Sequence, residues 1–242
     1  MGILDLFVSR EKREAKRIRD LAKRAQEKYG DPALRTRALE GLRDIGTPEA
    51  ISALLQRFTV RTEPGITDAE EKEYTLEILQ GFGDRAVEPV IEFLERSESG
   101  ISWAVRCLQS LVDRGRLVDA LCRILERLAA QYARAPDKKV TLLKLLGEQD
   151  DERVAETAAL FLDDPSDDVR MAALSTIRAR QAREIAPQIV ECLLSAESPR
   201  VRSACAEVLA EFGTELGERA EPVRAALPDG FQVDKSGVLR RA

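Results

Sequence analysis

The chain has 242 residues, a net charge of −5 at neutral pH and no histidine. This length is enough for one large domain with a sizeable core. The lack of histidine excludes Ser-His-Asp and Cys-His catalysis and every histidine metal ligand. Hydrophobic residues make up 44% and charged residues 33%, but aromatic residues only 5%. This composition favours a helical protein.

The first thirty residues are basic. Residues 1–30 hold nine basic and five acidic side chains, so residues 31–242 carry a net charge of −9. An acidic body argues against wrapping nucleic acid, which needs a basic groove. The stretch 10–30 predicts one helix with a narrow apolar stripe, and we expect it to cap the repeats described below. Its basic charge and the apolar start at Ile3, Leu4, Leu6 and Phe7 leave open an arm that contacts anionic lipid or nucleic acid.

The chain repeats itself at intervals of 32 to 37 residues. In each unit an apolar residue follows a marker position after four and seven residues, which places both on one helical face. The markers are Arg35, Lys72, Ala104, Pro136, Arg170 and Arg202. Eleven residues after the marker, five units have glycine, which ends helices by adopting a left-handed conformation. These glycines are Gly46, Gly83, Gly115, Gly147 and Gly213, and the Arg170 unit has Gln181 instead.

A second apolar run follows each of these positions and is long enough for a second helix. The runs cover residues 50–55, 86–94, 117–125, 153–162, 185–194 and 220–227. Helix starts are predicted at Asp31-Pro32, Thr47-Pro48, Asp68, Asp164-Pro165 and Ser198-Pro199, where a side-chain acceptor or a proline suits the first turn. Because a two-helix unit cannot bury its apolar face alone, stacked units are expected.

The fold class predicted from this pattern is all-α. We expect an α-solenoid of about six two-helix repeats over residues 31–227, an armadillo-type superhelix, with a capping helix over residues 1–30. The tail, residues 228–242, alternates apolar and polar residues around a Lys-Ser-Gly turn. It predicts a small hairpin or extended strand that caps the last repeat, or else a peptide that docks on another molecule.

The residues that carry the repeat also carry a family resemblance. The phrases DDVRMAALSTI, SPRVRSACAEVLAEFG and GDRAVEPVIEFL resemble HEAT repeats, especially the short HEAT-like repeats of phycobilin lyase (PBS lyase) subunits. The resemblance covers about four fifths of the chain at uneven quality. It implies an α-solenoid, and it leaves function open because such repeats serve many unrelated proteins.

The four cysteines lie in apolar periodic runs, and no two are spaced as CxxC. They are Cys107, Cys122, Cys192 and Cys205. We expect buried free thiols rather than a zinc site or disulfides. We therefore expect a reducing, cytoplasmic location and no metal or cofactor. The start MGILDLF does not have the pattern of a signal peptide, and no apolar run reaches 18 residues.

Two charged or irregular stretches interrupt the repeat. The segment 59–67 predicts a loop with a Pro-Gly turn, either a tolerated insertion or a contact point. Residues 148–168 contain nine acidic side chains and one basic one. We expect most of these carboxylates to cap helix N-termini, with an acidic ridge for a basic partner as the alternative.

No catalytic motif is found, and the prediction is a non-catalytic protein-interaction scaffold or adaptor. Gly81-Phe82-Gly83 follows a helix and lacks the third glycine of a phosphate loop. The single tryptophan, Trp103, is expected in the core or between repeats. The alternatives are a membrane- or nucleic-acid-associated adaptor that acts through residues 1–30, and a relative of HEAT-like lyases, chaperones or alkylpurine glycosylases.

The second helices are expected to line the concave face of such a solenoid. Polar residues on them are the candidate contacts for a protein partner of unknown identity. These residues are Arg57, Glu92, Arg96, Arg123, Arg127 and Glu191.

Overall fold

The computed structural model describes residues 3–130 and 136–242, with the side chains from residue 11 onward. The chain divides into two compact units, Met1–Leu117 and Val118–Ala242. The described residues form thirteen α-helices, three short 3-10 helices and one two-stranded sheet. The prediction of an all-α fold with at least ten helices is therefore confirmed.

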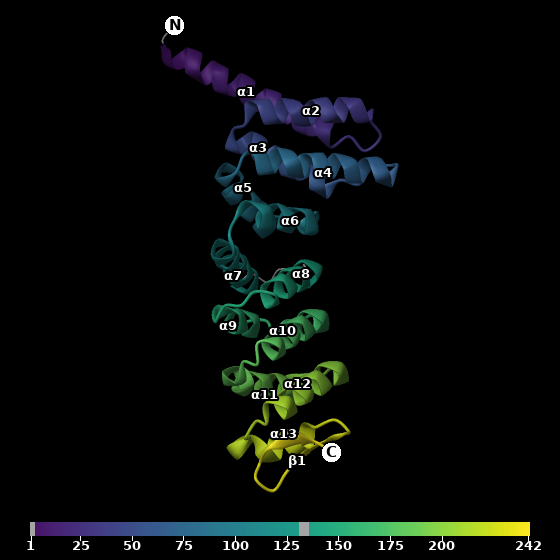
Figure 1. Ribbon diagram of the computed structural model, residues 1–242, viewed down its shortest axis with the longest axis vertical. Helices are drawn as coiled ribbons and strands as arrows, with labels where there is room; N and C mark the ends of the chain where they lie inside the picture. Colours follow the sequence, from purple (N-terminus) through teal and green to yellow (C-terminus); the bar gives the residue numbers. More distant parts are fainter. Residues whose placement is uncertain (1–2, 131–135) are drawn as a thin grey trace. The chain divides into compact units, whose positions relative to one another are not determined.

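The first unit contains three helical layers that follow the predicted repeat. In Figure 1, α2, α4 and α6 lie on one side of this unit and α3 and α5 on the other. Its elements are α1 (Ile3–Ala25), α2 (Pro32–Ile45), α3 (Pro48–Leu55), η1 (Gln56–Thr59), α4 (Gly65–Gly81), α5 (Asp84–Arg96), α6 (Ile101–Leu111) and the start of α7 (Arg114–Ala130).

The second unit repeats the arrangement. Here α8, α10 and α12 lie on one side, and α7, α9 and α11 lie on the other (Figure 1). The elements after α7 are α8 (Pro136–Gly147), α9 (Arg153–Ala159), α10 (Asp167–Ala179), η2 (Arg183–Ile185), α11 (Ala186–Ser195), α12 (Pro199–Phe212), η3 (Gly217–Arg219), α13 (Ala220–Ala226), β1 (Phe231–Val233) and β2 (Leu239–Arg241).

The core is built from the positions that the repeat singles out. Ten of the residues four and seven positions after the markers are leucine or isoleucine and are predicted to be buried, and nine of these ten are at most 3% exposed. They are Leu39, Leu42, Leu76, Leu79, Leu108, Leu143, Leu174, Ile177 and Leu209. Leu111 is only half-buried, because it is the last residue of α6. Trp103 is also half-buried and stacks on Phe58 of η1, with ring centroids 5.8 Å apart, so it does lie between repeats.

A helix ends within four residues of each of the five predicted glycines, but only some of these glycines adopt the left-handed conformation at the helix end. Gly46 and Gly213 follow α2 and α12 in the left-handed conformation, with φ of 59° and 64°. Gln181 occupies the equivalent position after α10 and adopts the same conformation, with φ of 51°. Gly115, by contrast, lies inside α7, and Gly147 is the last residue of α8. A Cβ on Gly147 would lie 3.0 Å from Thr176 Oγ1, so close packing against α10 accounts for this glycine.

Two predicted helix starts are wrong, and both involve buried aspartates. Helix α10 begins at Asp167 rather than at Pro165, and the carboxylate of Asp164 accepts a hydrogen bond from Ser166 N. Helix α4 begins at Gly65, three residues before Asp68. Proline starts are confirmed at Pro32, Pro48 and Pro199, where helices α2, α3 and α12 begin.

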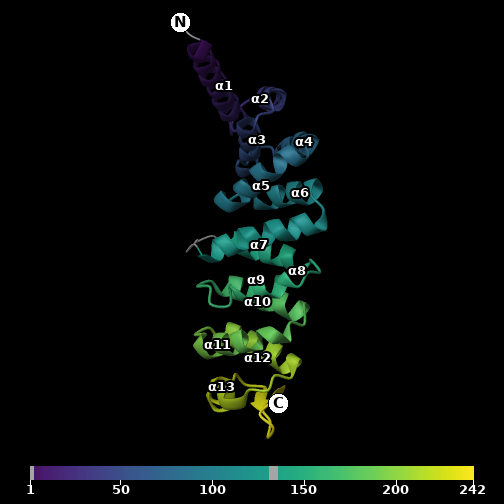
Figure 2. The ribbon, with the colours of Figure 1, turned by 90° about the vertical axis from the view of Figure 1, so that its left-hand side faces the viewer.

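The C-terminal half of α1 and the tail after α13 pack on neighbouring helices. Ala25 of α1 is fully buried, and the apolar stripe that precedes it contacts α2 and α3. Toward its N-terminus α1 extends beyond those helices (Figure 2). At the other end, β1 and β2 pair antiparallel, and the buried Leu239 sits where β2 packs on α12. The tail is thus the hairpin that its alternating pattern predicted.

Candidate interaction surface

Three grooves lie beside the second helices of the repeats. One separates α3 from α5, the next separates α7 from α9, and the third lies between α11 and the segment that leads into α13. Their volumes are about 250, 490 and 630 Å³. Each groove follows from the repeat itself, because adjacent second helices pack through their apolar stripes and their polar edges separate toward solvent.

The first groove contains two of the predicted contact residues. Glu92 and Arg96 are one turn apart on α5, with 3.6 Å between the carboxylate and the guanidinium. The Arg96 side chain is 80% exposed, so this pair holds its geometry only weakly. The buried Leu55 and Phe93 form the floor. The groove therefore offers apolar depth with charge at its edge.

The second groove contains Arg123 and carries charges of both signs. Asp119 and Glu126 of α7 face Arg153 and Glu156 of α9 across it. The guanidinium of Arg153 bonds Asp119 at 2.7 Å and Asp151 at 2.9 Å, and these carboxylates raise the pKa of Arg153. Arg127, which was also predicted, is exposed on α7, one turn beyond Arg123.

The same groove contains an apolar residue that the sequence did not single out. Leu160 is 48% exposed there, because α9 ends at Ala159 and leaves Leu160 outside its buried face. The periodic run 153–162 had predicted one continuous apolar face. The thiol of Cys122 is buried at the groove floor, and burial raises its pKa.

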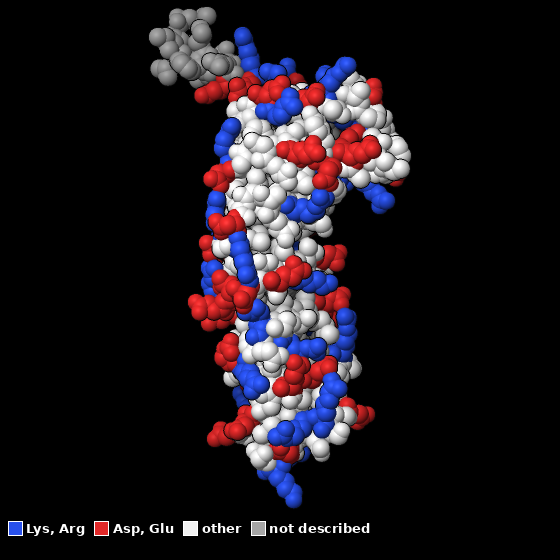
Figure 3. All heavy atoms as spheres, viewed as in Figure 1, with Lys and Arg blue, Asp and Glu red and all other residues white. Residues whose placement is uncertain are grey.

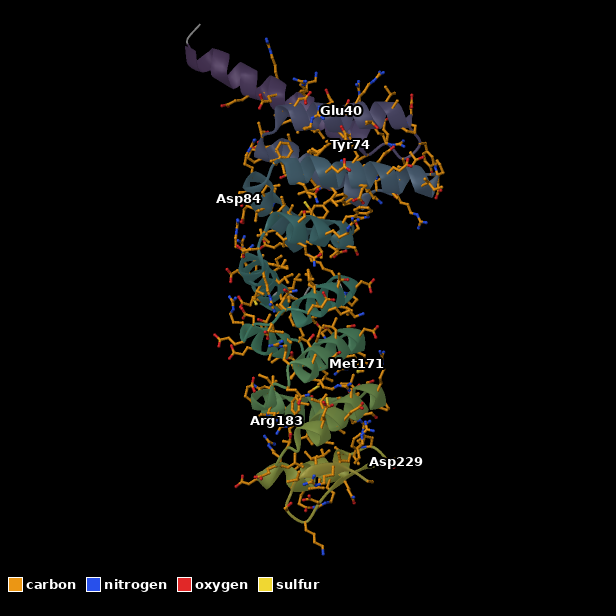
Figure 4. The ribbon with its side chains drawn as sticks, viewed as in Figure 1. Glu40, Tyr74, Asp84, Met171, Arg183 and Asp229 are labelled. Atoms are coloured by element: carbon orange, nitrogen blue, oxygen red, sulfur yellow. The ribbon has the colours of Figure 1, made fainter. Side chains whose placement is uncertain are left out.

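The third groove contains Glu191 and two arginines. Glu191 Oε1 lies 2.6 Å from Arg219 Nη2 across the groove. Arg183 lines the opposite part of it and is labelled in Figure 4. Four of the six predicted residues, Glu92, Arg96, Arg123 and Glu191, thus line three separate grooves rather than one cluster.

Arg57 does not belong to this surface, and its prediction as a contact residue is wrong. Its side chain is 0% exposed and lies at the centre of a buried charge network in the first unit. Its guanidinium donates to Asp68 at 2.7 Å, to Glu71 at 2.9 Å and to the carbonyl of Val60 at 2.9 Å. The sequence placed Arg57 on a polar face, but the turn after α3 directs it inward.

The buried charge network, formed by Arg35, Arg57, Asp68, Glu71 and Lys72, joins α2, η1 and α4. Glu71 also accepts three hydrogen bonds from Arg35, at 2.7, 2.9 and 3.1 Å, and Lys72 lies 2.8 Å from Asp68. Burial raises the pKa of Asp68, but hydrogen bonds from Lys72 and Arg57 outweigh this and bring the pKa down to about 2. Every charge in the network has a partner, as buried charges require.

The acidic stretch 148–168 lies partly at helix N-termini, as expected, and it also pairs with arginine and lysine. Asp167 and Asp168 are in the first turn of α10, and Asp151 accepts a hydrogen bond from the backbone N–H of Arg153 at the start of α9. Asp164 pairs with the buried Lys139 at 2.6 Å, and Asp168 pairs with Arg200 of the next repeat at 2.8 Å. Asp150 and Asp167 pair with Arg180 and Arg170. In the part of the chain whose side chains are described, no group of three acidic or cysteine ligands could hold a metal ion.

Two family models match the chain. Residues 159–242 match the model for HEAT repeats, and residues 34–58 match the model for the PBS lyase HEAT-like repeat. Residues 34–58 and 159–242 are therefore similar to HEAT repeats. The resemblance noted from the sequence is thereby confirmed for one stretch of the first unit and one stretch of the second unit. A comparison with curated proteins finds no match.

HEAT repeats form stacked helix pairs and are generally of a scaffold type, in keeping with grooves beside the second helices. The PBS lyase repeats among them are related to lyases. Within the helices that the structure describes, none is long and apolar enough to cross a membrane.

Proposed function

We propose that this HEAT-repeat chain is a non-catalytic, cytoplasmic scaffold that binds protein partners through the grooves beside its second helices. The observation that carries the proposal is the groove between α7 and α9. It combines an exposed apolar residue, Leu160, with Glu126, Glu156 and Arg153 within about 490 Å³. An apolar anchor point ringed by charges of both signs is typical of a protein-binding surface.

The surface is shallow and extended, which suits a partner protein better than a small substrate. Specific interfaces bury roughly 800 Å² on each partner, and several neighbouring grooves together could supply that area. The exposed charges should contribute mainly to the rate and specificity of association, and salt should weaken their effect. The four buried thiols, which are expected in a reducing compartment, support the cytoplasmic location.

The test begins with the full chain as bait, followed by mass spectrometry of the captured proteins. Each captured partner is then measured against the double variant Glu126→Arg/Glu156→Arg and against Leu160→Asp. We expect at least about tenfold weaker binding for both. The control is Glu148→Arg, which reverses an exposed charge just after α8 and outside the groove.

Equal affinity of wild type and all groove variants would contradict the proposal, as would turnover of a small substrate. The competing adaptor function depends on the basic helix α1. Binding to anionic vesicles or nucleic acid that requires residues 1–30 and ignores the groove variants would favour that alternative.

A further inference from the structure

Apolar side chains gather at one edge of the first unit, away from the grooves. Among the side chains that the structure describes, four large hydrophobic ones are exposed, and three of them lie here. Tyr29 is 91% exposed, Leu34 47% and Ile66 76%. They come from the turn between α1 and α2, the first turn of α2 and the first turn of α4. We call Tyr29, Leu34 and Ile66 the edge patch.

The buried charge network places these three segments side by side. Arg35, next to Leu34, donates to the carbonyl of Gly30, next to Tyr29, at 2.5 Å. The same guanidinium binds Glu71 of α4, five residues after Ile66. The N-terminal ends of α2 and α4 meet at this edge (Figure 1). The patch is therefore carried on a fixed base rather than on independent loops.

The surroundings of the patch are apolar and then acidic. Pro32, Ala33, Pro64 and Ala69 are exposed beside it. Figure 3 shows uncharged surface at this end of α4, with acidic and basic side chains around it. The exposed charges on the two segments 27–34 and 61–70 are acidic at Glu27, Asp31, Glu63 and Glu70 and basic at Lys28 and Arg61. A matching ligand would present apolar residues followed by basic ones.

The N-terminal half of this chain's own α1 has that chemistry. The sequence ILDLFV at residues 3–8 is followed by six basic and two acidic residues between positions 10 and 19. All side chains from Glu11 to Arg17 are exposed except Glu14, which is half-buried, so this part of the helix is covered by its own protomer on one face at most. Its other faces are available to a partner.

The patch of the same protomer is out of reach of this segment. Helix α1 has 23 residues, and at about 1.5 Å per residue its start lies about 35 Å from its end. The edge patch is at the end, because Tyr29 follows Ala25 by four residues. Only the α1 helix of another molecule can bring residues 3–8 to the patch.

We propose that the edge patch is a homotypic docking site, which binds the N-terminal end of α1 from a second copy of this chain. Two copies that each insert α1 into the other's patch form a closed, two-fold dimer. The apolar residues of α1 cover Tyr29, Leu34 and Ile66, and its basic residues meet the acidic border. This dimer contact is separate from the grooves beside the second helices.

Sedimentation over a range from micromolar to submillimolar concentration tests the proposal. We expect the average mass to rise from 26.9 kDa toward twice that value. Ile66→Asp, Leu34→Asp and a chain lacking residues 1–9 should each weaken association at least about tenfold. Aspartate suits the first turn of a helix, so the two substitutions should leave α4 and α2 folded. Unchanged melting temperatures verify this for all three variants.

The matched control is Leu160→Asp, because Leu160 is 48% exposed against 47% for Leu34. It should leave self-association unchanged while weakening the partner binding proposed for the grooves. Leu34→Asp should do the reverse, so the two proposals can fail separately.

Mixing two defective variants identifies the contact. Ile66→Asp retains an intact α1, and the chain lacking residues 1–9 retains an intact patch, so an equimolar mixture should recover part of the association. Recovery supports the exchange of α1, and its absence counts against that exchange. Association of the chain lacking residues 1–9 as tight as that of the wild type would show that patch packs on patch. A wild-type chain that stays monomeric throughout overturns the proposal. So does a monomer whose residues 1–9 are needed to bind anionic phospholipid vesicles, which would assign α1 to a membrane surface.

Discussion

The same repeat is joined in different ways in the two units. Arg35 of α2 and Arg170 of α10 are equivalent marker residues, four positions before Leu39 and Leu174. Arg35 is 1% exposed and reaches across to Glu71 of the next first helix, α4. Arg170 instead pairs with Asp167 of its own helix, and its buried Nε has no hydrogen-bond partner among the described residues.

The difference comes from one position in the following repeat. The residue before the marker is Glu71 in α4 but Val201 in α12, and Val201 is fully buried. A carboxylate there draws Arg35 and Arg57 into the junction, whereas valine leaves the α10–α12 junction apolar. A buried ion network is costly to desolvate and adds specificity of packing more readily than stability. An apolar junction depends on area and fit alone.

The largest expected effect is at the centre of the buried charge network. Glu71→Gln keeps the shape of the side chain but leaves Arg35 and Arg57 without their shared carboxylate. We expect a loss of about 3–5 kcal/mol in the free energy of unfolding of the first unit, measured in urea. Glu73→Gln is the control, since Glu73 lies on the same helix with its side chain 48% exposed and pairs with Arg106. A loss below about 1 kcal/mol for Glu71→Gln would mean that the network is not essential to the junction.

Truncation of the shared core should affect both units alike. Leu42→Ala in α2 and Leu209→Ala in α12 each remove a side chain that is 0% exposed, and both residues lie seven positions after the marker of their repeat. Each should cost about 2–5 kcal/mol, because a cavity is added to the loss of buried apolar area. Amide hydrogen exchange can read the two units separately. Loss of protection confined to the mutated unit is the expected result, and equal loss in both would show that they unfold as one body.

Acid should weaken the first unit through the same network. The pKa of Asp68 is about 2 in the folded chain, below the value of about 4 for an unfolded aspartate. The unfolded state therefore binds the proton first, and the stabilisation from Asp68 is complete above about pH 4 and is lost as the pH falls toward about 2. Between those pH values, the free energy of unfolding should fall more steeply with decreasing pH for the wild type than for Asp68→Asn. Equal slopes would exclude Asp68 as a source of acid sensitivity.

The smallest expected effect concerns the one repeat without glycine. Gln181 has φ of 51° after α10, a conformation that costs an L-residue roughly 1 kcal/mol and glycine almost nothing. Gln181→Gly should stabilise the second unit by about 0.5–1 kcal/mol, after the loss of an exposed hydrogen bond to Glu211. Gly213→Ala is the inverse change at φ of 64° and should destabilise by a similar amount. A thermal melt distinguishes the two signs.

Sequence periodicity by itself determined the helix pairs and most of the core. Apolar residues four and seven positions after a marker must share a helical face, whatever the rest of the chain does. For this reason Leu39, Leu79, Leu143 and Leu209 could be assigned to the interior without a structure. The hairpin after α13 was foreseen on similar grounds, since alternation around a turn is also a local signal.

The tertiary structure alone decided which charges are buried and which apolar residues are exposed. The sequence predicted Arg57 as a surface residue, yet it is buried against Asp68 and Glu71, which lie 11 and 14 positions later in the chain. Arg35 depends on Glu71, 36 positions away in the chain. Leu160 fits an apolar pattern but is exposed, because α9 stops one residue before it. Ile66 lies in a segment predicted as a loop, and it is exposed in the first turn of α4. A helical pattern fixes the direction of a side chain within its own helix, but burial depends on what the next repeat places opposite it.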